Sequence, residues 1–503
     1  MSTHPTPRCS IGTRIKIGHD DPTLTGHAGL LLTGELVRRL EVVGTIEEAV
    51  NRARQFKRRR RGLNAGELMV SLAETVMVGG DHLVHLDQLR GDQAGAELRA
   101  VAAAPAPTTA SQLLKRFTLG QSRAVVAAMA ELGNRFDREH ELLTASAPVT
   151  LDMDGTLSEV YGRQKEMASF NHEGRRGFLS VLVTWDERRR VLAADLLKGS
   201  ASEKPGAVRL LRRALRTLPQ GHGPVSLRVD SGFYTVELLE ACRRNRVEFC
   251  VSVARTEAMW ARLYAKLNVK SWRPALDMEN AEVAEFAYTP GGWKHEPLRA
   301  IVRRVRVVAD EVSGDGRSRR RRTIPKGQMA LLQRGRVGYV FSYSFLLTDK
   351  LGDAAEIERW HRQRAHIEER IKEAKNGCGL IHLPMREATA NRAWQAAVVV
   401  AHNLVSMLAV EVAADNRRRL HERVADAVEE VDLRHAAPER VQPHNLQLVR
   451  RWLINVPARV VHRARQVFVR LAAGTYREEI VVSDGTRIKS KGPLDEHRGH
   501  GGR

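Results

Sequence analysis

The chain has 503 residues, 43% of them hydrophobic, which is enough for about three domains of roughly 150 residues each. Its 81 Lys and Arg exceed its 59 Asp and Glu, so the formal net charge is +22. This excess excludes an acidic disordered protein, argues against an enzyme of small metabolites, and favours a polyanionic partner.

Four cysteines form no Cys-x-x-Cys pair and have no histidine at finger-like spacing, so they indicate neither a zinc site nor a disulfide framework. This cysteine usage fits a reducing, intracellular compartment. Because no apolar run follows a basic start, we also expect no signal peptide. The stretch from Ala393 to Ala414 is apolar but contains Gln395, His402, Asn403 and Glu411. We therefore expect a buried core helix and no membrane partner.

The first 148 residues predict a helical region. Apolar residues follow helical spacing over Val37 to Arg54 and over Ala65 to Val78, and Gly79-Gly80-Asp81 ends the second helix. Seven basic residues with no acid among them lie around the junction of these helices: Arg52, Arg54, Lys57, Arg58, Arg59, Arg60 and Arg61. Such a run is either a solvated face or a DNA-binding surface, and we expect residues 1–148 to bind DNA.

From residue 149 the pattern changes to strands. We predict strands at 149–154, 178–185 and 191–197, a helix at 204–217, a strand at 225–230, a helix at 235–245 and a strand at 247–253. This β-β-β-α-β-α-β order is that of a ribonuclease H-like core, so the fold class is α/β and residues 149–254 form the first part of that core.

Residues 255–347 interrupt the core with predicted strands such as 300–308 and 338–347, and form a basic β-rich insertion. Over Arg303 to Arg336 there are eleven Lys and Arg against three acids, a surface suited to phosphates. Its densest run consists of Arg319, Arg320, Arg321 and Arg322.

Residues 348–415 contain a long predicted helix from about 354 to 375 and form the second part of the core. Residues 416–503 are predicted to be helical and basic, with a disordered tail from Lys489.

Two acidic residues stand at the ends of predicted strands, Asp154 at the end of the first strand and Asp230 at the end of the fourth. These strands are neighbours in the predicted fold order, so the two carboxylates converge, which favours a divalent cation between them. The alternative is that each aspartate only starts a turn, since Asp154-Gly155-Thr156 and Asp230-Ser231-Gly232 are both typical turn sequences.

Four polar residues share one stripe of the predicted helix at about 100° per residue: His361, Arg364, Glu368 and Lys375. An apolar stripe beside them would lay the helix against a sheet and hold the charged stripe at the sheet's edge. An ordinary salt-bridged helix face is the alternative explanation.

The spacing of these four residues resembles the Tyr-Arg-Glu-Lys signature of DDE transposases from bacterial insertion sequences, with His361 in place of the tyrosine. The stretches 154–156 and 230–234 look like the two aspartate motifs of the same group. Further stretches resemble the branch named after insertion sequence thirteen-eighty: 62–66, 79–81, 89–92, 198–201 and 391–394.

This resemblance implies a ribonuclease H-like catalytic core split by the β insertion. By the match, Asp154, Asp230 and Glu368 bind two Mg²⁺ ions, for which Mn²⁺ can substitute, and His361, Arg364 and Lys375 contact backbone phosphates. The implied reaction is metal-dependent cleavage at the terminal inverted repeats of the element, followed by joining of the 3′-OH ends to target DNA. Asp152 points to the same face as Asp154 and is a rival for the first position.

The implied partner is double-stranded DNA, as transposon ends and as target. Pairing two ends requires two active sites, so we expect a homodimer on DNA, in the cytoplasm and nucleoid of a bacterium. Trp293 in the insertion is either a side chain that stacks on a displaced base or part of the insertion's own core.

Two other functions are consistent with parts of the sequence. Residues 151–156 resemble the Asp-x-Asp-Gly-Thr motif of haloacid dehalogenase-type phosphatases, in which Asp152 would be the nucleophile and Asp154 the acid/base. That motif comes late in the chain, however, and a β meander follows it. The basic charge also fits a non-catalytic DNA-binding protein, such as an inactivated transposase, but this does not account for the three converging acids.

Overall fold

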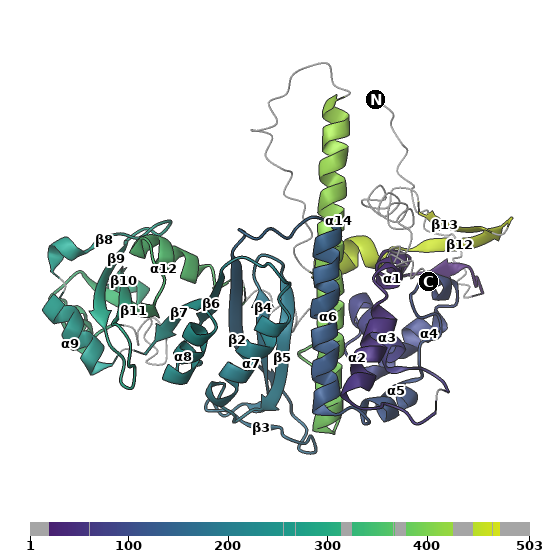
Figure 1. The fold of residues 1–503 in the computed structure, drawn as a ribbon, viewed down its shortest axis with the longest axis horizontal. Helices are drawn as coiled ribbons and strands as arrows, with labels where there is room; N and C mark the ends of the chain where they lie inside the picture. Colours follow the sequence, from purple (N-terminus) through teal and green to yellow (C-terminus); the bar gives the residue numbers. More distant parts are fainter. Residues whose placement is uncertain are drawn as a thin grey trace, which may run out of the picture.

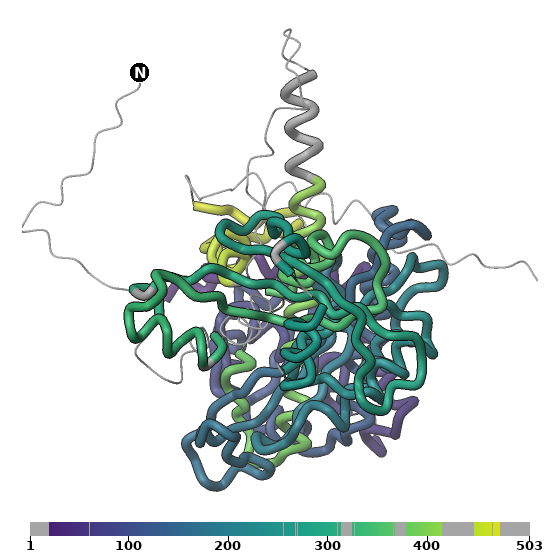
Figure 2. The backbone as a smooth tube through the Cα atoms, turned by 90° about the vertical axis from the view of Figure 1, so that its left-hand side faces the viewer, coloured from purple at the N-terminus to yellow at the C-terminus, as the bar shows by residue number. Residues whose placement is uncertain are grey.

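In the computed structural model, the described residues are 20–59, 61–254, 256–266, 268–312, 324–365, 367, 379–425, 446–464 and 466–472. A single large mixed sheet forms one half of the molecule, and a group of helices forms the other (Figure 1). Helices α6 (Leu119–Glu139) and α14 (Ala388–Ala425) pack on the β5 side of the sheet, between it and the remaining N-terminal helices. Figure 2 shows the molecule from the left-hand side of Figure 1, with the strands of the predicted insertion nearest the viewer.

The N-terminal region is helical, as predicted. Its helices are α1 (Leu30–Arg39), α2 (Val42–Ala53), α3 (Ala65–Val78), α4 (Leu86–Gly91), α5 (Pro107–Leu114) and α6, with 3₁₀ turns at Leu83–His85 and Ala94–Glu97. The predicted helix 65–78 matches α3, which begins with a capping box between Asn64 and Glu67. The predicted helix 37–54 is divided, because Glu41 adopts a left-handed conformation (φ 55°) that separates α1 from α2.

Five strands form the central part of the sheet in the order β5–β4–β2–β6–β7. They are β2 (Val149–Glu159), β4 (Arg176–Trp185), β5 (Arg190–Lys198), β6 (Val225–Val229) and β7 (Val247–Val253), with helices α7 (Lys204–Arg216) and α8 (Val236–Arg244) between the later strands. Strand β2 is antiparallel to β4 and parallel to β6. It extends five residues beyond the predicted end because its pairing with β4 continues as far as Glu159.

The strands of residues 255–347 lengthen this same sheet. Strand β11 (Tyr339–Thr348) pairs antiparallel with β7, and the order continues through β10 (Leu298–Val308), β9 (Ala281–Tyr288) and β8 (Arg273–Pro274). The short β3 (Ser169–Phe170) pairs with β4 at the other end. The helices of this part are α9 (Glu257–Lys266), α11 (Lys326–Gln333) and α12 (Ala354–Arg362), with 3₁₀ turns at Val269–Ser271 and Ala309–Glu311.

Helix α14 packs against α3, α6 and β5 in the main core. Its first part, Ala388–Ala414, is long and apolar enough to span a membrane by length and composition, but 78% of its most apolar window is buried inside the protein. Its polar residues have partners there, since Asn403 exchanges two hydrogen bonds of 2.9 Å with the backbone of Val191. This burial is typical of a core helix.

The described part of the C-terminal region is not entirely helical. After α15 (Leu446–Val449) and a π-helical turn at Arg450–Ile454, β12 (Ala458–Arg463) and β13 (Gln466–Leu471) form a hairpin that pairs with β1 (Leu24–Thr25). The expectation of helix here was wrong, because residues 458–471 are rich in valine and alternate in a strand-like pattern. The tail from Lys489 lies outside the described residues.

Candidate active site

Asp154 and Asp230 lie side by side at the centre of the sheet. Strands β2 and β6 run parallel, with Met153 opposite Val229 as their last pair, and the two aspartates follow at the next position of each strand. The Asp154 side chain is 14% exposed and that of Asp230 is 41% exposed. Each carboxylate also accepts a local backbone hydrogen bond of 2.9 Å, from Gly155 and Gly232 respectively. The predicted turn is present only at Asp230, which directly follows β6, whereas Asp154 to Thr156 continue strand β2 because their pairing with β4 continues to Glu159. The predicted convergence of the two aspartates is present.

Arg364 lies between the two aspartates. One guanidinium nitrogen is 3.1 Å from an oxygen of Asp154 and 3.8 Å from an oxygen of Asp230, and the side chain is 11% exposed. A positive charge thus compensates two carboxylates that would otherwise repel each other. The two carboxylates form a site suited to a cation with oxygen ligands. In this structure the guanidinium of Arg364 is the cation between them.

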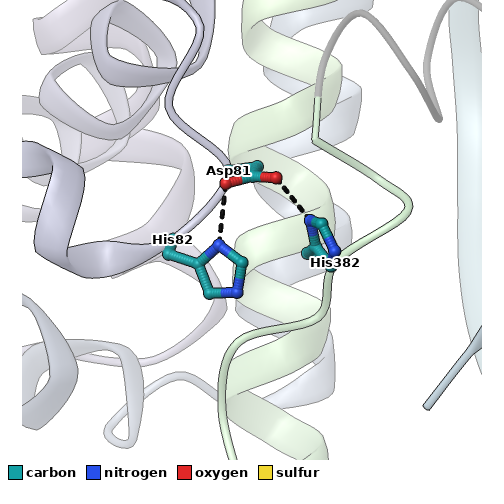
Figure 3. Close-up of side chains that lie close together, drawn as sticks. All are labelled: Asp81, His82 and His382. Carbon is teal, nitrogen blue, oxygen red and sulfur yellow. Dashed lines mark hydrogen bonds and ion pairs between the residues drawn. The ribbon is translucent and has the colours of Figure 1, made fainter. Parts of the chain in front are cut away.

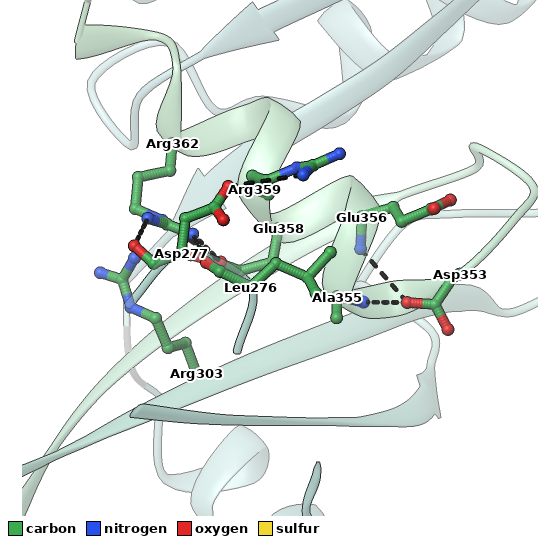
Figure 4. Close-up of polar contacts among 9 residues, drawn as sticks. All are labelled: Leu276, Asp277, Arg303, Asp353, Ala355, Glu356, Glu358, Arg359 and Arg362. Carbon is green, nitrogen blue, oxygen red and sulfur yellow. Dashed lines mark hydrogen bonds and ion pairs between the residues drawn. The ribbon is translucent and has the colours of Figure 1, made fainter. Parts of the chain in front are cut away.

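Helix α12 places Arg364 at the sheet. Asp353 caps the helix by accepting hydrogen bonds from the backbone of Ala355 (2.8 Å) and Glu356 (3.2 Å). Further along, Glu358 accepts a 2.5 Å hydrogen bond from Arg303 of β10, and Arg362 donates one of 2.5 Å to the carbonyl of Leu276 (Figure 4). These contacts fix the helix across the strands of residues 273–308.

The predicted helix from about 354 to 375 is interrupted within its described part. Helix α12 ends at Arg362, and Gln363 and Arg364 form a turn in which the amide of Arg364 donates to the carbonyl of His361. His361 and Arg364 therefore do not share one helical stripe as expected. The turn directs Arg364 toward Asp154 and Asp230, and Arg364 forms an ion pair with each of them. Glu368 and Lys375 lie outside the described residues.

His361 is buried at 7% exposure, which corrects the expectation that it contacts a phosphate. Its Nε2–H donates to the carbonyl of Val229, 3.4 Å away, directly before Asp230. Burial, followed by the positive charge of Arg364, lowers the pKa of His361 to about 3, so the imidazole is neutral. Its position supports the end of β6.

A further carboxylate, which the sequence did not reveal, lies beside the two aspartates. Glu203 is the residue before α7. A Cβ atom added to Gly155 would lie 2.7 Å from one Glu203 oxygen, and one added to Gly232 would lie 3.6 Å from the other. Burial and the negative charge of Asp230 raise the pKa of Glu203. Its only sequence signal is its place two residues after the motif at 198–201.

Asp152 lies two residues before Asp154 on strand β2 and is more deeply buried. Both of its oxygens accept hydrogen bonds of 2.7 Å from Arg228, and Arg228 is also 2.9 Å from Asp186. The side chains of Asp152 and Arg228 are both fully buried. Asp152 is therefore placed as part of a buried ion-pair network and is inaccessible as a phosphatase nucleophile.

Trp293 is also buried, at 6% exposure. Its Nε1–H donates to the carbonyl of Glu296 (2.9 Å), and its ring meets that of Phe249 edge-on. Of the two interpretations in the sequence analysis, the structure agrees with the core residue. With 6% of Trp293 exposed, little of the indole is accessible to a displaced base in this structure.

The predicted basic surface is described only in part. Arg58, Arg59 and Arg61 are exposed and line a concavity of about 570 Å³ together with Gln112 and Arg116 of the α5 segment. Arg60 and the run Arg319, Arg320, Arg321 and Arg322 lie outside the described residues.

Comparisons with known proteins identify the family of the chain. No curated protein matches the chain. Among solved structures, the chain is similar to a piggyBac transposase in a synaptic complex with hairpin DNA, at 12% identity and a TM-score of 0.33, over 82% of this chain and 86% of that one. The family model for the transposase DDE domain, group 1, matches residues 9–423. The chain therefore belongs to the group 1 family of DDE-domain transposases.

Proposed function

We propose that this transposase binds the terminal inverted repeats of its own insertion sequence, cleaves the DNA ends by metal-dependent phosphodiester hydrolysis, and joins the 3′-OH ends to target DNA. The observation that carries the proposal is the pair Asp154 and Asp230, which lie side by side on parallel strands and share the guanidinium of Arg364. The catalytic set is Asp154, Asp230 and Glu368.

The proposed core is ribonuclease H-like. The strand order β5–β4–β2–β6–β7, with one antiparallel meander and two parallel neighbours, supports this assignment. We propose the same division as the sequence analysis, namely a DNA-binding region at 1–148, core parts at 149–254 and 348–415, an insertion at 255–347, and a C-terminal region at 416–503. We further assign the protein to the branch of insertion sequence thirteen-eighty, on the motifs given above.

The residues fit a site for two Mg²⁺ ions, or Mn²⁺ in their place. Asp154, Asp230 and Glu368 supply the hard oxygen ligands that these ions prefer, and the ions, when bound, activate the attacking oxygen and stabilise the leaving oxygen. Glu203 adds a carboxylate beside Asp230, from which it can orient water or a ligand residue. When metal ions occupy the carboxylates, Arg364 is released from its ion pair with Asp154 and can contact a DNA phosphate bound beside the site.

The partner is double-stranded DNA, bound by a homodimer in the bacterial cytoplasm and nucleoid. Lys375 joins Arg364 at the phosphates near the cut. The exposed Arg58, Arg59 and Arg61, with Arg60, contact the ends, and Arg319, Arg320, Arg321 and Arg322 add phosphate contacts from the insertion. The net charge of +22 supports such a partner.

The test is cleavage of a supercoiled plasmid that carries the DNA flanking this gene, in Mg²⁺ with and without EDTA. We expect cuts at the element boundary that disappear in EDTA and in the Asp230→Ala and Glu368→Gln variants. If the folded wild-type protein binds the ends but never cuts them, it is an inactivated transposase and the proposed reaction is wrong.

A further inference from the structure

Besides the proposed catalytic carboxylates, a second cluster of side chains is arranged like a metal site. Asp81 and His82 follow α3, and His382 comes from the segment that precedes α14 (Figure 3). The His82 Nδ1 is 2.7 Å from one oxygen of Asp81, and the His382 Nδ1 is hydrogen-bonded to the other. One potential ligand atom from each of the three residues lies within 4.8 Å of the other two. Among the described residues, no other group of three or more His, Cys, Asp or Glu side chains meets this criterion.

The backbone brings these two distant segments together. Gly379 has φ +71°, and a Cβ atom added to it would lie 3.3 Å from Asp81, so the segments approach closely at this point. The Ser158 hydroxyl donates to the carbonyl of Leu380 (2.8 Å), and the Trp394 indole donates to that of Gly379 (3.4 Å). His382 is therefore held opposite Asp81 by contacts that do not involve the imidazole itself.

A neighbouring histidine, His85, holds the backbone of Asp81 and His82 in place. The Nδ1 of His85 accepts hydrogen bonds from the backbone amides of Asp81 (3.0 Å) and His82 (3.3 Å). That nitrogen is engaged by the turn, so His85 fixes the orientation of the two residues and leaves the Asp81, His82 and His382 atoms as the ligands. Supporting contacts of this kind are common around ligands in metal sites.

The cluster is accessible to an ion and to water. The side chains are 30% (Asp81), 46% (His82) and 45% (His382) exposed. A cavity of about 630 Å³ borders both histidines and is also lined by Tyr161 and Lys165. Three protein ligands and an open side are the features of a four-coordinate site completed by water.

We propose that Asp81, His82 and His382 bind one Zn²⁺ ion through a carboxylate oxygen and two Nδ1 atoms. Two imidazoles and one carboxylate favour Zn²⁺ over Mg²⁺, which prefers oxygen ligands alone. The bound ion links the turn after α3 to the segment 379–385, which directly follows the part of the chain that contains Glu368 and Lys375. The site is thus a cross-link between the N-terminal helices and the end of the catalytic segment, and it is separate from the all-carboxylate catalytic set.

The test is metal binding by the full-length protein in excess Mg²⁺, which occupies the proposed catalytic carboxylates. Co²⁺ is the spectroscopic probe, and Zn²⁺ is then added as competitor. We expect the visible absorption of four-coordinate Co²⁺ at one ion per chain, displaced by one equivalent of Zn²⁺. Zn²⁺ should also raise the melting temperature of the wild-type protein.

Three variants locate the ion. His382→Ala and Asp81→Asn should each weaken Zn²⁺ binding by roughly tenfold or more and remove the rise in melting temperature. His462→Ala is the matched control, because His462 is exposed and paired with a single carboxylate, Glu97, at 2.8 Å; it should bind as the wild type does. Melting temperatures in EDTA that agree among all four proteins show that the variants are folded.

The outcome is independent of the catalytic proposal. Asp230→Asn should lose DNA cleavage and keep the Co²⁺ spectrum, whereas His382→Ala should lose the spectrum whatever its cleavage. Wild-type protein that binds no Co²⁺ or Zn²⁺ in excess Mg²⁺, or His382→Ala protein that binds as tightly as the wild type, would overturn the zinc site.

Discussion

A guanidinium nitrogen of Arg364 lies 3.1 Å from a carboxylate oxygen of Asp154, on a strand far from it in the sequence. The same nitrogen is 3.8 Å from Asp230. Any divalent cation that binds both aspartates therefore competes with this guanidinium. The arrangement keeps two like charges together in the absence of metal and couples metal binding to a movement of Arg364.

The first prediction concerns this competition. Arg364→Gln removes the guanidinium and leaves the two carboxylates facing each other. We expect tighter Mn²⁺ binding, by roughly tenfold, since about 1.4 kcal/mol of competing interaction corresponds to that factor, together with loss of DNA cleavage. Calorimetric titration of Mn²⁺ measures the affinity. Unchanged or weaker binding in a folded variant would show that Arg364 does not compete with the metal.

The second prediction contrasts two aspartates on one strand. Asp152→Ala leaves the fully buried Arg228 without its bidentate partner, and breaking a buried pair in this way costs roughly 3 kcal/mol or more. Asp154→Ala should cost less than about 1 kcal/mol, because Arg364 keeps Asp230 as a partner. Urea unfolding measures both. Equal losses of stability would contradict the distinction between a structural and a catalytic aspartate.

The third prediction concerns Glu203. Its carboxylate lies against Gly155 and Gly232 beside the aspartates, so Glu203→Gln should reduce both Mn²⁺ affinity and end cleavage by roughly ten- to a hundredfold, as loss of a supporting group does at other metal sites. Glu237→Gln is the control, since Glu237 is an exposed residue in the first turn of α8. Equal cleavage by the two variants would exclude Glu203 from the site.

The fourth prediction concerns pH. Glu74 of α3 is fully buried, and this burial raises its pKa to about 7 although the amide of Ala100 donates to it. Between the unfolded value of 4.5 and about 7, the folded state binds a proton that the unfolded state does not. Stability therefore falls as pH rises through this window, by on the order of 3 kcal/mol.

Glu74→Gln should remove that pH dependence. The variant is expected to match the wild type near pH 5 and to be more stable near pH 8, because the amide carries no charge to bury. Chemical unfolding at the two pH values measures the difference. A wild-type protein that is equally stable at both values would disprove the prediction.

The order of elements followed from the sequence, because local patterns of apolar residues determine where strands and helices form. Strand β7 and helix α3 have their predicted bounds, and the other core strands differ by one or two residues at most of their ends. The neighbouring positions of Asp154 and Asp230 also followed, since the chain order of the strands restricts how they can pair.

The surroundings of the site depended on tertiary structure. Arg364 and His361 are three residues apart, yet one faces the aspartates and the other is buried under Val229, because a turn that no periodicity indicates ends α12 between them. Glu203 and His382 meet partners far away in the sequence. The sequence by itself determined which elements form and which aspartates converge. Only the packing of distant segments decided which side chains surround them, because burial and charge at a site are set by contacts that no local pattern encodes.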